Sequence, residues 1–271
     1  MDRCGTAGDP ADRKALGEPC EATGKEAQMN ILVVNGSPRG KQGNTYILQE
    51  AFMRGAVSAG ARVEEVFLKS KKISPCIGCM SCWIKTPGKC VQKDDQAELL
   101  EKCVGADLLA LATPLYVDGM TAQAKIFFDR LIPLGHPEFI LVDGHCRHPP
   151  VRRKEWKFIL ISNCGFHEMD NFDALIMHCK RICRNFGSEY AGHLLRPHGP
   201  LLGLPEIFGE AIHGISRAAE KAGEEIVRNG ALSEQTMREV SSEIVPLDTY
   251  VQMVNAYWSA EKEKAVSQKL S

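Results

Sequence analysis

The fold is decided by the stretch Ile31-Leu-Val-Val-Asn-Gly-Ser-Pro-Arg-Gly-Lys-Gln-Gly-Asn-Thr45. Its first four residues form a short, continuously apolar run, which is typical of a parallel strand buried on both faces. A loop rich in glycine and polar residues follows, and the apolar pattern after it predicts a helix from about Thr45 to Ala59 that stops at Gly60. A buried strand that passes through such a loop into a helix is the first unit of an α/β sheet.

The same alternation of strand and helix continues to residue 195. Apolar runs predict further strands at 63–68, 107–113, 157–162 and 189–195, with helices at 96–103, 121–131 and 170–186. This order predicts the α/β fold class, with an open parallel sheet covered by helices on both faces. Ligands of such sheets bind beyond the carboxyl ends of the strands, so the loops at those ends are expected to carry the chemistry.

The two ends of the 271-residue chain differ from this middle part. Residues 1–28 are polar and lack a period of 2 or 3.6, so we expect a disordered leader, followed by one α/β domain over 29–200. The segment 201–271 is predicted to be a helical C-terminal extension, with helices ending at Asn229 and spanning 233–243 and 248–263. These helices can pack on the domain or on a second subunit.

Composition restricts the classes of partner. With 33 Lys and Arg against 34 Asp and Glu, the formal net charge is −1, so no electrostatic attraction to nucleic acid or to an anionic membrane is expected. No apolar run approaches the roughly 20 residues that span a bilayer, and no secretory signal is recognisable. We therefore expect a cytoplasmic protein that acts on small molecules, where clustered cysteines serve metal binding or redox chemistry.

The loop after the first strand has the features of a phosphate site. Its glycines let the backbone approach a ligand, and the helix that follows presents free N–H groups to an anion. The spacing matches neither a P-loop nor a dinucleotide-binding fingerprint. The number of donors nevertheless favours a phosphate site over an ordinary polar loop. Hydrogen-bond donors and one positive charge come from Ser37, Asn44, Thr45 and Arg39.

Two further loops are expected at the same edge of the sheet. The loop 113–120 offers a flat, half-apolar wall, where Leu115 and Tyr116 can contact the face of a flavin ring while backbone amides bond its polar edge. The loop that opens with Asn163 follows the fourth predicted strand. It contains His167, which is either a proton donor to a reduced substrate or a solvated side chain.

Four of the eleven cysteines are close enough in sequence to converge on one soft metal centre. Three interpretations stay open for them: a [4Fe–4S] cluster that extends electron transfer, a structural zinc site, or a lid whose thiols bind nothing. Of the other cysteines, three are expected in the core, and the segment 136–148 is expected to cover the flavin or contact a second subunit. The four clustered cysteines are Cys76, Cys79, Cys82 and Cys90, and the three core cysteines are Cys103, Cys179 and Cys183.

These loops together resemble a known family. Gly36-Ser-Pro-Arg39 with Gly43-Asn-Thr45, Thr113-Pro-Leu-Tyr116 with Met120-Thr-Ala-Gln123, and Asn163-Cys-Gly165 are similar to the NAD(P)H-dependent FMN reductase group of the flavodoxin superfamily. The spacing of the four cysteines, with Asp94-Asp95 downstream, resembles the iron–sulfur flavoprotein branch of that group. The likeness covers about Met29 to Leu195.

The resemblance implies a flavodoxin-like five-stranded parallel sheet, noncovalent FMN, reduction by NADH or NADPH, and a homodimer or homotetramer whose subunits complete each other's flavin sites. By the same resemblance, the FMN phosphate is assigned to Ser37, Arg39, Asn44 and Thr45. The ring is assigned to Pro114, Leu115, Tyr116, Val117, Asn163, Cys164 and Gly165.

The function expected from the sequence is therefore an FMN-dependent oxidoreductase. Electrons would pass from a nicotinamide cofactor through FMN to a small acceptor such as a quinone, or to an iron–sulfur cluster, and FMN rather than a side chain would carry the chemistry. An alternative is an electron carrier between protein partners that uses no nicotinamide. A second alternative is a regulator that binds flavin or metal without turnover, with the helical extension as its partner surface.

Overall fold

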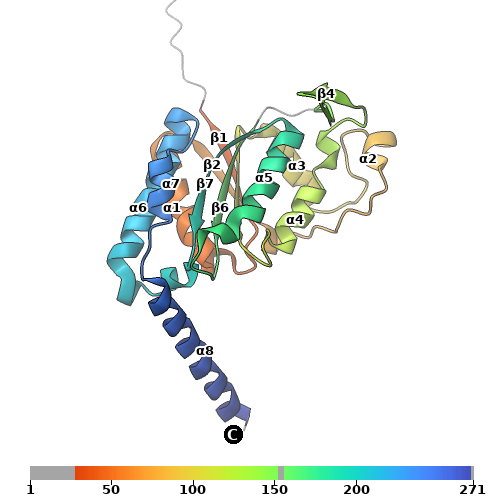
Figure 1. Ribbon diagram of the computed structural model, residues 1–271. Helices are drawn as coiled ribbons and strands as arrows, with labels where there is room; N and C mark the ends of the chain where they lie inside the picture. Colours follow the sequence, from red (N-terminus) through yellow and green to blue (C-terminus); the bar gives the residue numbers. More distant parts are fainter. Residues whose placement is uncertain (1–27, 152–155, 270–271) are drawn as a thin grey trace, which may run out of the picture.

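The computed structural model describes residues 28–151 and 156–269, so the predicted leader lies outside the described residues except for its last position. Five strands form one sheet in the order β2-β1-β3-β6-β7, and every neighbouring pair is parallel (Figure 1). This order is that of flavodoxin-like sheets, so the predicted fold class is confirmed. The strands are β1 Asn30–Asn35, β2 Arg62–Phe67, β3 Leu108–Pro114, β6 Lys157–Asn163 and β7 Glu189–Arg196.

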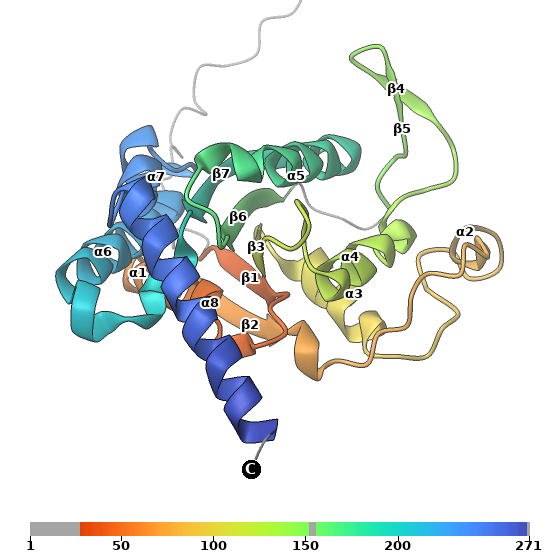
Figure 2. The same ribbon diagram turned by 60° about the horizontal axis from the view of Figure 1, so that its bottom comes forward.

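Successive side chains of a strand point to opposite faces, and the sheet therefore has two apolar cores. Leu32 and Val34 of β1 pack in a core with α3 (Gln96–Gly105), α4 (Ala122–Asp129) and α5 (Asp173–Phe186). The alternate residues Ile31 and Val33 pack in the other core, with α1 (Asn44–Ser58) and α6 (Pro205–Asn229) (Figure 2). The first core also contains the three cysteines predicted to be buried, Cys103, Cys179 and Cys183.

The helix α6 crosses α1 at very close range. A Cβ atom added at Gly55 of α1 would lie 1.8 Å from the backbone oxygen of Glu220, and one added at Gly223 of α6 would lie 2.0 Å from the backbone oxygen of Phe52. Only glycine permits this approach, and α7 (Glu234–Val240) then packs beside α6 and β7. The division at residue 200 stays a prediction, and packing joins α6 to the sheet across it.

The last helix, α8 (Leu247–Lys269), begins at the carboxyl edge of the sheet and extends away from it (Figure 1). Tyr250 near its start is buried, whereas the paired rings of Tyr257 and Trp258 are more than half exposed. No helix in the described part of the chain is both long and apolar enough to cross a membrane.

Two short elements are inserted around the end of α4. The helix α2 (Ser81–Ile84) lies in the cysteine loop, and the strands β4 (Ile140–Val142) and β5 (His145–Arg147) form an exposed antiparallel hairpin. Phe186, the last residue of α5, lines the hollow beside this hairpin. The end of α5 lies at the edge of the sheet opposite the carboxyl ends of the strands. The segment 136–148 therefore lies away from the predicted flavin loops of its own chain, and a cover over the flavin stays a prediction. Contact with a second subunit stays a prediction.

Candidate functional site

The loop between β1 and α1 is folded tightly on itself. The side-chain oxygen of Asn35 accepts a hydrogen bond from the backbone N–H of Ser37 at 2.9 Å, and the hydroxyl of Ser37 accepts one from the N–H of Arg39 at 3.3 Å. Gly40 has φ +56° and accepts at its carbonyl from the N–H of Gly43 at 3.0 Å. Gly43 is the N-cap of α1 and provides no side-chain cap. The positive end of the α1 dipole thus opens into this loop, as an anion site requires.

The three predicted loops meet at one edge of the sheet. The buried hydroxyl of Thr45, after β1, donates a hydrogen bond to the side-chain oxygen of Asn163, at the end of β6. The backbone carbonyl of Asn163 accepts from the N–H of Leu115, after β3, at 2.9 Å. Thr121, the N-cap of α4, donates to the backbone carbonyl of Gly36 at 2.7 Å. These bonds join three loops that are far apart in sequence into one frame, and the bonds of Thr45 and Thr121 each connect residues more than 80 positions apart.

The structure gives two of the predicted phosphate residues other partners. Thr45 is 1% exposed, and its hydroxyl is engaged by Asn163. The side-chain amide of Asn44 donates to the carbonyl of Gly199 at 3.0 Å, in the turn after β7. Both side chains therefore connect loops. The groups that lie around the turn itself are the Ser37 hydroxyl, Arg39 and the start of α1.

The predicted ring wall is a turn that stands out from the sheet edge. Pro114 is buried, Leu115 packs on the first core, and Tyr116 and Gly119 exchange backbone hydrogen bonds at 3.0 and 3.2 Å. Val117 is 99% exposed and has φ 47°. A β-branched residue in the left-handed region is strained, and such strain concentrates at ligand-binding turns.

The third loop is held from the C-terminal side of the chain. The thiol of Cys164 is buried, and this burial raises its pKa, so it is a neutral packing group. The carbonyl of Gly165 accepts a hydrogen bond from the hydroxyl of Tyr250 at 2.5 Å. The Nε2 atom of His167 lies 3.0 Å from the carbonyl of Val245, and its ring stacks on that of His198 at 4.7 Å. The structure thus turns His167 toward the C-terminal segment.

Sequence reasoning missed the buried pair behind this loop, Arg196 and His198. The Arg196 guanidinium donates to the carbonyl of Val240 at 2.9 Å and lies 2.7 Å from Nε2 of His198. Burial lowers the pKa of Arg196 to about 10, and burial with the charges of Arg196 and His167 lowers the pKa of His198 to about 3. The pair fixes the segment before α8 to the sheet edge. The one feature of the sequence that pointed to this pair is that an apolar strand ends in polar residues.

The four clustered cysteines line one pocket beside α2. Gly78 and Met80 have φ of 65° and 52°, so the loop bends sharply at both positions. A hydrogen bond from Ser81 lowers the pKa of the Cys79 thiol, whereas burial and the other three cysteines raise the pKa of Cys82. Within residues 28–151 and 156–269, no three His, Cys, Asp or Glu side chains form a group that could hold a metal ion as they stand. The four thiols that line this pocket have the donor chemistry of zinc and of iron–sulfur sites.

The cysteine pocket and the three loops lie at opposite ends of α4. Thr121 caps the start of this helix and contacts the first loop, whereas Arg130, just after its end, lines the cysteine pocket. Eight helical residues rise about 12 Å. Within one chain, the cysteine pocket and the three loops are therefore separated by about the length of α4.

A parallel sheet in this order defines a flavodoxin-like fold, and the N-terminus of α1 opens into its first loop. Residues 29–143 match the family of NADPH-dependent FMN reductases, which confirms the resemblance found in the sequence. The matched segment contains the first two loops and the four cysteines.

Curated iron–sulfur flavoproteins are similar over the same part of the chain. One from Archaeoglobus fulgidus is 42% identical over 108 residues, which cover 40% of this chain and 48% of the relative. Another from Methanocaldococcus jannaschii is 39% identical over 106 residues, which cover 39% and 53% of the two chains. The chain spans about half the length of the curated relatives it matches.

Solved structures share the fold at low identity. An FMN-dependent NADH-azoreductase from Bacillus anthracis, solved with FMN, superposes with a TM-score of 0.55 at 14% identity, covering 76% of this chain and all of the other. An NAD(P)H:quinone oxidoreductase from Methanothermobacter marburgensis gives 0.54 at 18% identity, covering 74% and 98%. These similarities extend the flavodoxin-like fold across about three quarters of the chain.

Proposed function

We propose that the protein is an FMN-dependent oxidoreductase that takes electrons from NADH or NADPH and passes them to a small acceptor such as a quinone. The observation that carries the proposal is the hydrogen-bonded frame of three loops at the carboxyl edge, in which Thr45 and Asn163 join the loops after β1 and β6 beside the open end of α1. The family match over residues 29–143 supports FMN as the ligand of this edge.

The residues present fit FMN. A phosphate needs N–H donors and a positive field, and the uncapped start of α1, the Ser37 hydroxyl and Arg39 supply them. An isoalloxazine ring needs a flat and partly apolar wall, which the turn at Tyr116 and Val117 offers. When bound, FMN supplies the redox chemistry that amino-acid side chains lack.

The role of the protein's own residues is to bind FMN and to orient it. The frame fixes the spacing between the phosphate turn and the ring wall, because Asn163 is bonded to both neighbouring loops. The thiol of Cys164 is buried and its pKa is raised by that burial, so it offers neither a thiolate nor a readily lost proton. His167 is engaged with the carbonyl of Val245. The proposal therefore assigns no side chain as a nucleophile.

We include a [4Fe–4S] cluster on Cys76, Cys79, Cys82 and Cys90 in this proposal. Its support is that the four cysteines line one pocket. The iron–sulfur flavoproteins that match this part of the chain support the same choice. A homodimer or homotetramer and a cytoplasmic location also belong to the proposal.

An electron carrier between proteins is the second candidate. The observation that favours it is the exposure of Cys76 and Cys79, which opens the cysteine pocket to a protein partner at the end of α4 away from the flavin loops. A carrier of this kind would receive electrons from a partner and would not react with a nicotinamide.

Anaerobic mixing of the FMN-loaded protein with NADH or NADPH separates the two candidates. The oxidoreductase predicts rapid loss of the flavin's visible absorbance and its return when a quinone is added, with repeated turnover. A flavin that stays oxidised with both nicotinamides, but is reduced by dithionite, would reject the oxidoreductase and favour the carrier. A protein that binds no FMN would reject both.

A further inference from the structure

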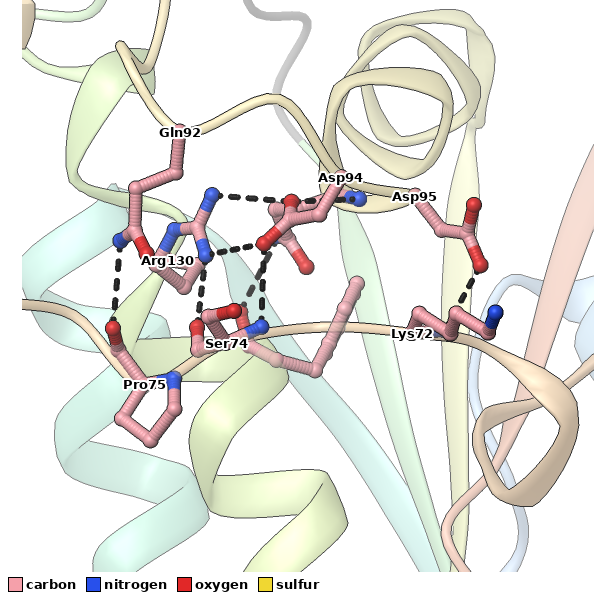
Figure 3. A network of polar contacts seen from close by, with 9 residues as sticks. Lys72, Ser74, Pro75, Gln92, Asp94, Asp95 and Arg130 are labelled. Atoms are coloured by element: carbon pink, nitrogen blue, oxygen red, sulfur yellow. Dashed lines mark hydrogen bonds and ion pairs between the residues drawn. The ribbon is translucent and has the colours of Figure 1, made fainter.

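The two ends of the cysteine loop are fastened together by a polar clasp, shown in Figure 3. A carboxylate oxygen of Asp94 accepts from the backbone N–H of Ser74 at 3.0 Å, and Asp95 accepts from the N–H of Lys72 at 2.7 Å. The side-chain amide of Gln92 donates to the carbonyl of Pro75 at 3.1 Å. The residues before Cys76 are thereby joined to those after Cys90, so the loop is closed without a ligand.

Arg130 lies at the centre of this clasp. Its guanidinium donates to both carboxylate oxygens of Asp94, at 2.8 and 3.0 Å, and to the carbonyl of Ser74 at 2.6 Å (Figure 3). The Arg130 side chain is 1% exposed, and that of Asp94 is 10% exposed. Burial would raise the pKa of Asp94, but hydrogen bonds from Arg130 and from two backbone N–H groups hold it below its usual range. The clasp is thus a charged pair at neutral pH.

The same residue also belongs to the wall of the cysteine pocket. Arg130 and all four cysteines line one pocket. The Nε atom of Arg130 is buried and has no hydrogen-bond partner among the residues that the structure describes. Burial lowers the pKa of Arg130, whereas Asp94 and the neighbouring Cys90 raise it. A buried cation with an unused N–H therefore lines the cysteine pocket, and the carboxylate of Asp94 holds it there.

We propose that Arg130 is a positioning residue that sets the reduction potential of the cysteine site, by holding its buried positive charge in the wall of the pocket that the four cysteines line. The inference rests on the cluster in the proposed function. Adding an electron to a thiolate-bound cluster increases its negative charge, so a nearby cation and an N–H···S hydrogen bond favour the reduced form. Asp94 counteracts this effect because its negative charge lies next to the guanidinium.

The electron in this scheme comes from the reduced flavin of the proposed function, and one electron is taken up by the site. Arg130 keeps its proton, and no bond to it is made or broken. The residue changes only the free energy of the added electron. Because both charges are buried, their influence on the site is screened less than that of surface charges.

This account predicts opposite effects for the two members of the clasp. Arg130→Gln removes the cation and should lower the reduction potential of the site. A tenfold change in the one-electron equilibrium constant corresponds to a shift of about 59 mV. Asp94→Asn removes the opposing charge and should raise the potential. Arg130→Lys keeps a positive charge and should lie nearer to wild type than Arg130→Gln. Lys102→Gln removes a cation on the surface of α3, outside the pocket, and is the matched control that should change nothing.

The test is an anaerobic redox titration of the reconstituted protein, followed by electron paramagnetic resonance, with iron, sulfide and FMN measured in every variant. Opposite shifts for Arg130→Gln and Asp94→Asn, at unchanged FMN content, would support the inference. Equal potentials, or shifts of the same sign, would show that the clasp only shapes the loop. If Arg130→Gln does not retain iron, the comparison of Asp94→Asn with Arg130→Lys still decides the sign.

The proposed cluster and the proposed role of Arg130 can be rejected independently. A wild-type protein that holds FMN but takes up no iron and sulfide would reject the cluster, and this inference with it, and would leave the flavin chemistry standing. A wild-type cluster whose potential ignores Arg130 would reject this inference alone.

Discussion

Replacing Thr45 by valine tests whether this residue holds the site together or touches the ligand. Thr45→Val preserves the shape of a side chain that is 1% exposed and removes the hydroxyl that donates to Asn163. A buried acceptor that loses its donor costs about 1–3 kcal/mol. The free energy of unfolding of the FMN-free protein should fall by that amount.

The same change should weaken ligand binding. Asn163 also accepts from the N–H of Leu115, so its release loosens both the phosphate turn and the ring wall. Binding must then restore the frame, and the affinity for FMN should fall about tenfold or more, since 1.4 kcal/mol corresponds to a factor of ten. Thr45→Ser keeps the hydroxyl and should bind FMN nearly as wild type does.

Two measurements check this prediction: urea denaturation of the FMN-free protein, and titrations of flavin fluorescence with FMN and with riboflavin. A frame residue should weaken both ligands by similar factors and lower the stability of the free protein. If Thr45→Val leaves that stability unchanged and weakens FMN alone, the hydroxyl contacts the phosphate directly and the reasoning from the Asn163 bond is refuted.

Two further predictions concern the packing of α1 on α6 and the buried His198. Gly55→Ala should destabilise the protein by about 1–3 kcal/mol, because the new Cβ would lie 1.8 Å from the backbone oxygen of Glu220. Gly214→Ala is the control: a Cβ there would meet no atom within 4 Å, so this change should stabilise α6 by about 0.5–1 kcal/mol. Denaturation curves check both, and equal effects would contradict the close crossing of α1 and α6. His198 has a pKa of about 3 in the fold against 6.5 ordinarily, so the unfolded chain takes up a proton that the folded chain refuses, and stability should fall as pH drops from 6.5 toward 3. Asparagine tolerates the left-handed backbone at position 198, so His198→Asn is a suitable test. It should remove about 1 kcal/mol of the fall in unfolding free energy between pH 7.5 and 5.5. An unchanged dependence of stability on pH would show that this histidine is not responsible.

The sheet and its loops could be predicted because their signals are local. The strand predicted at 107–113 is Leu108–Pro114, and the helix predicted to end at Asn229 does so. Continuous apolar runs, glycine stops and polar loop residues each act within a few positions of the chain. The order of these elements was then sufficient to place three loops at one edge.

The rest depends on contacts between distant segments. The roles of Thr45 and Arg196 are set by partners that are 118 and 44 residues away in sequence. The course of the cysteine loop is fixed by Asp94 and Arg130, 36 residues apart, which hold it at the far end of α4. No local pattern contains such information.

The central claim is that the carboxyl edge of the sheet binds FMN through the phosphate turn at the start of α1. Comparison of FMN with riboflavin, which lacks the phosphate, tests it most directly. Loss of two hydrogen bonds to a charged group, each contributing about 1.5–3 kcal/mol, corresponds to about a 100-fold change in affinity or more. The account predicts one FMN per chain and riboflavin weaker by at least that factor; equal affinities for the two flavins, or no binding of FMN, would contradict it.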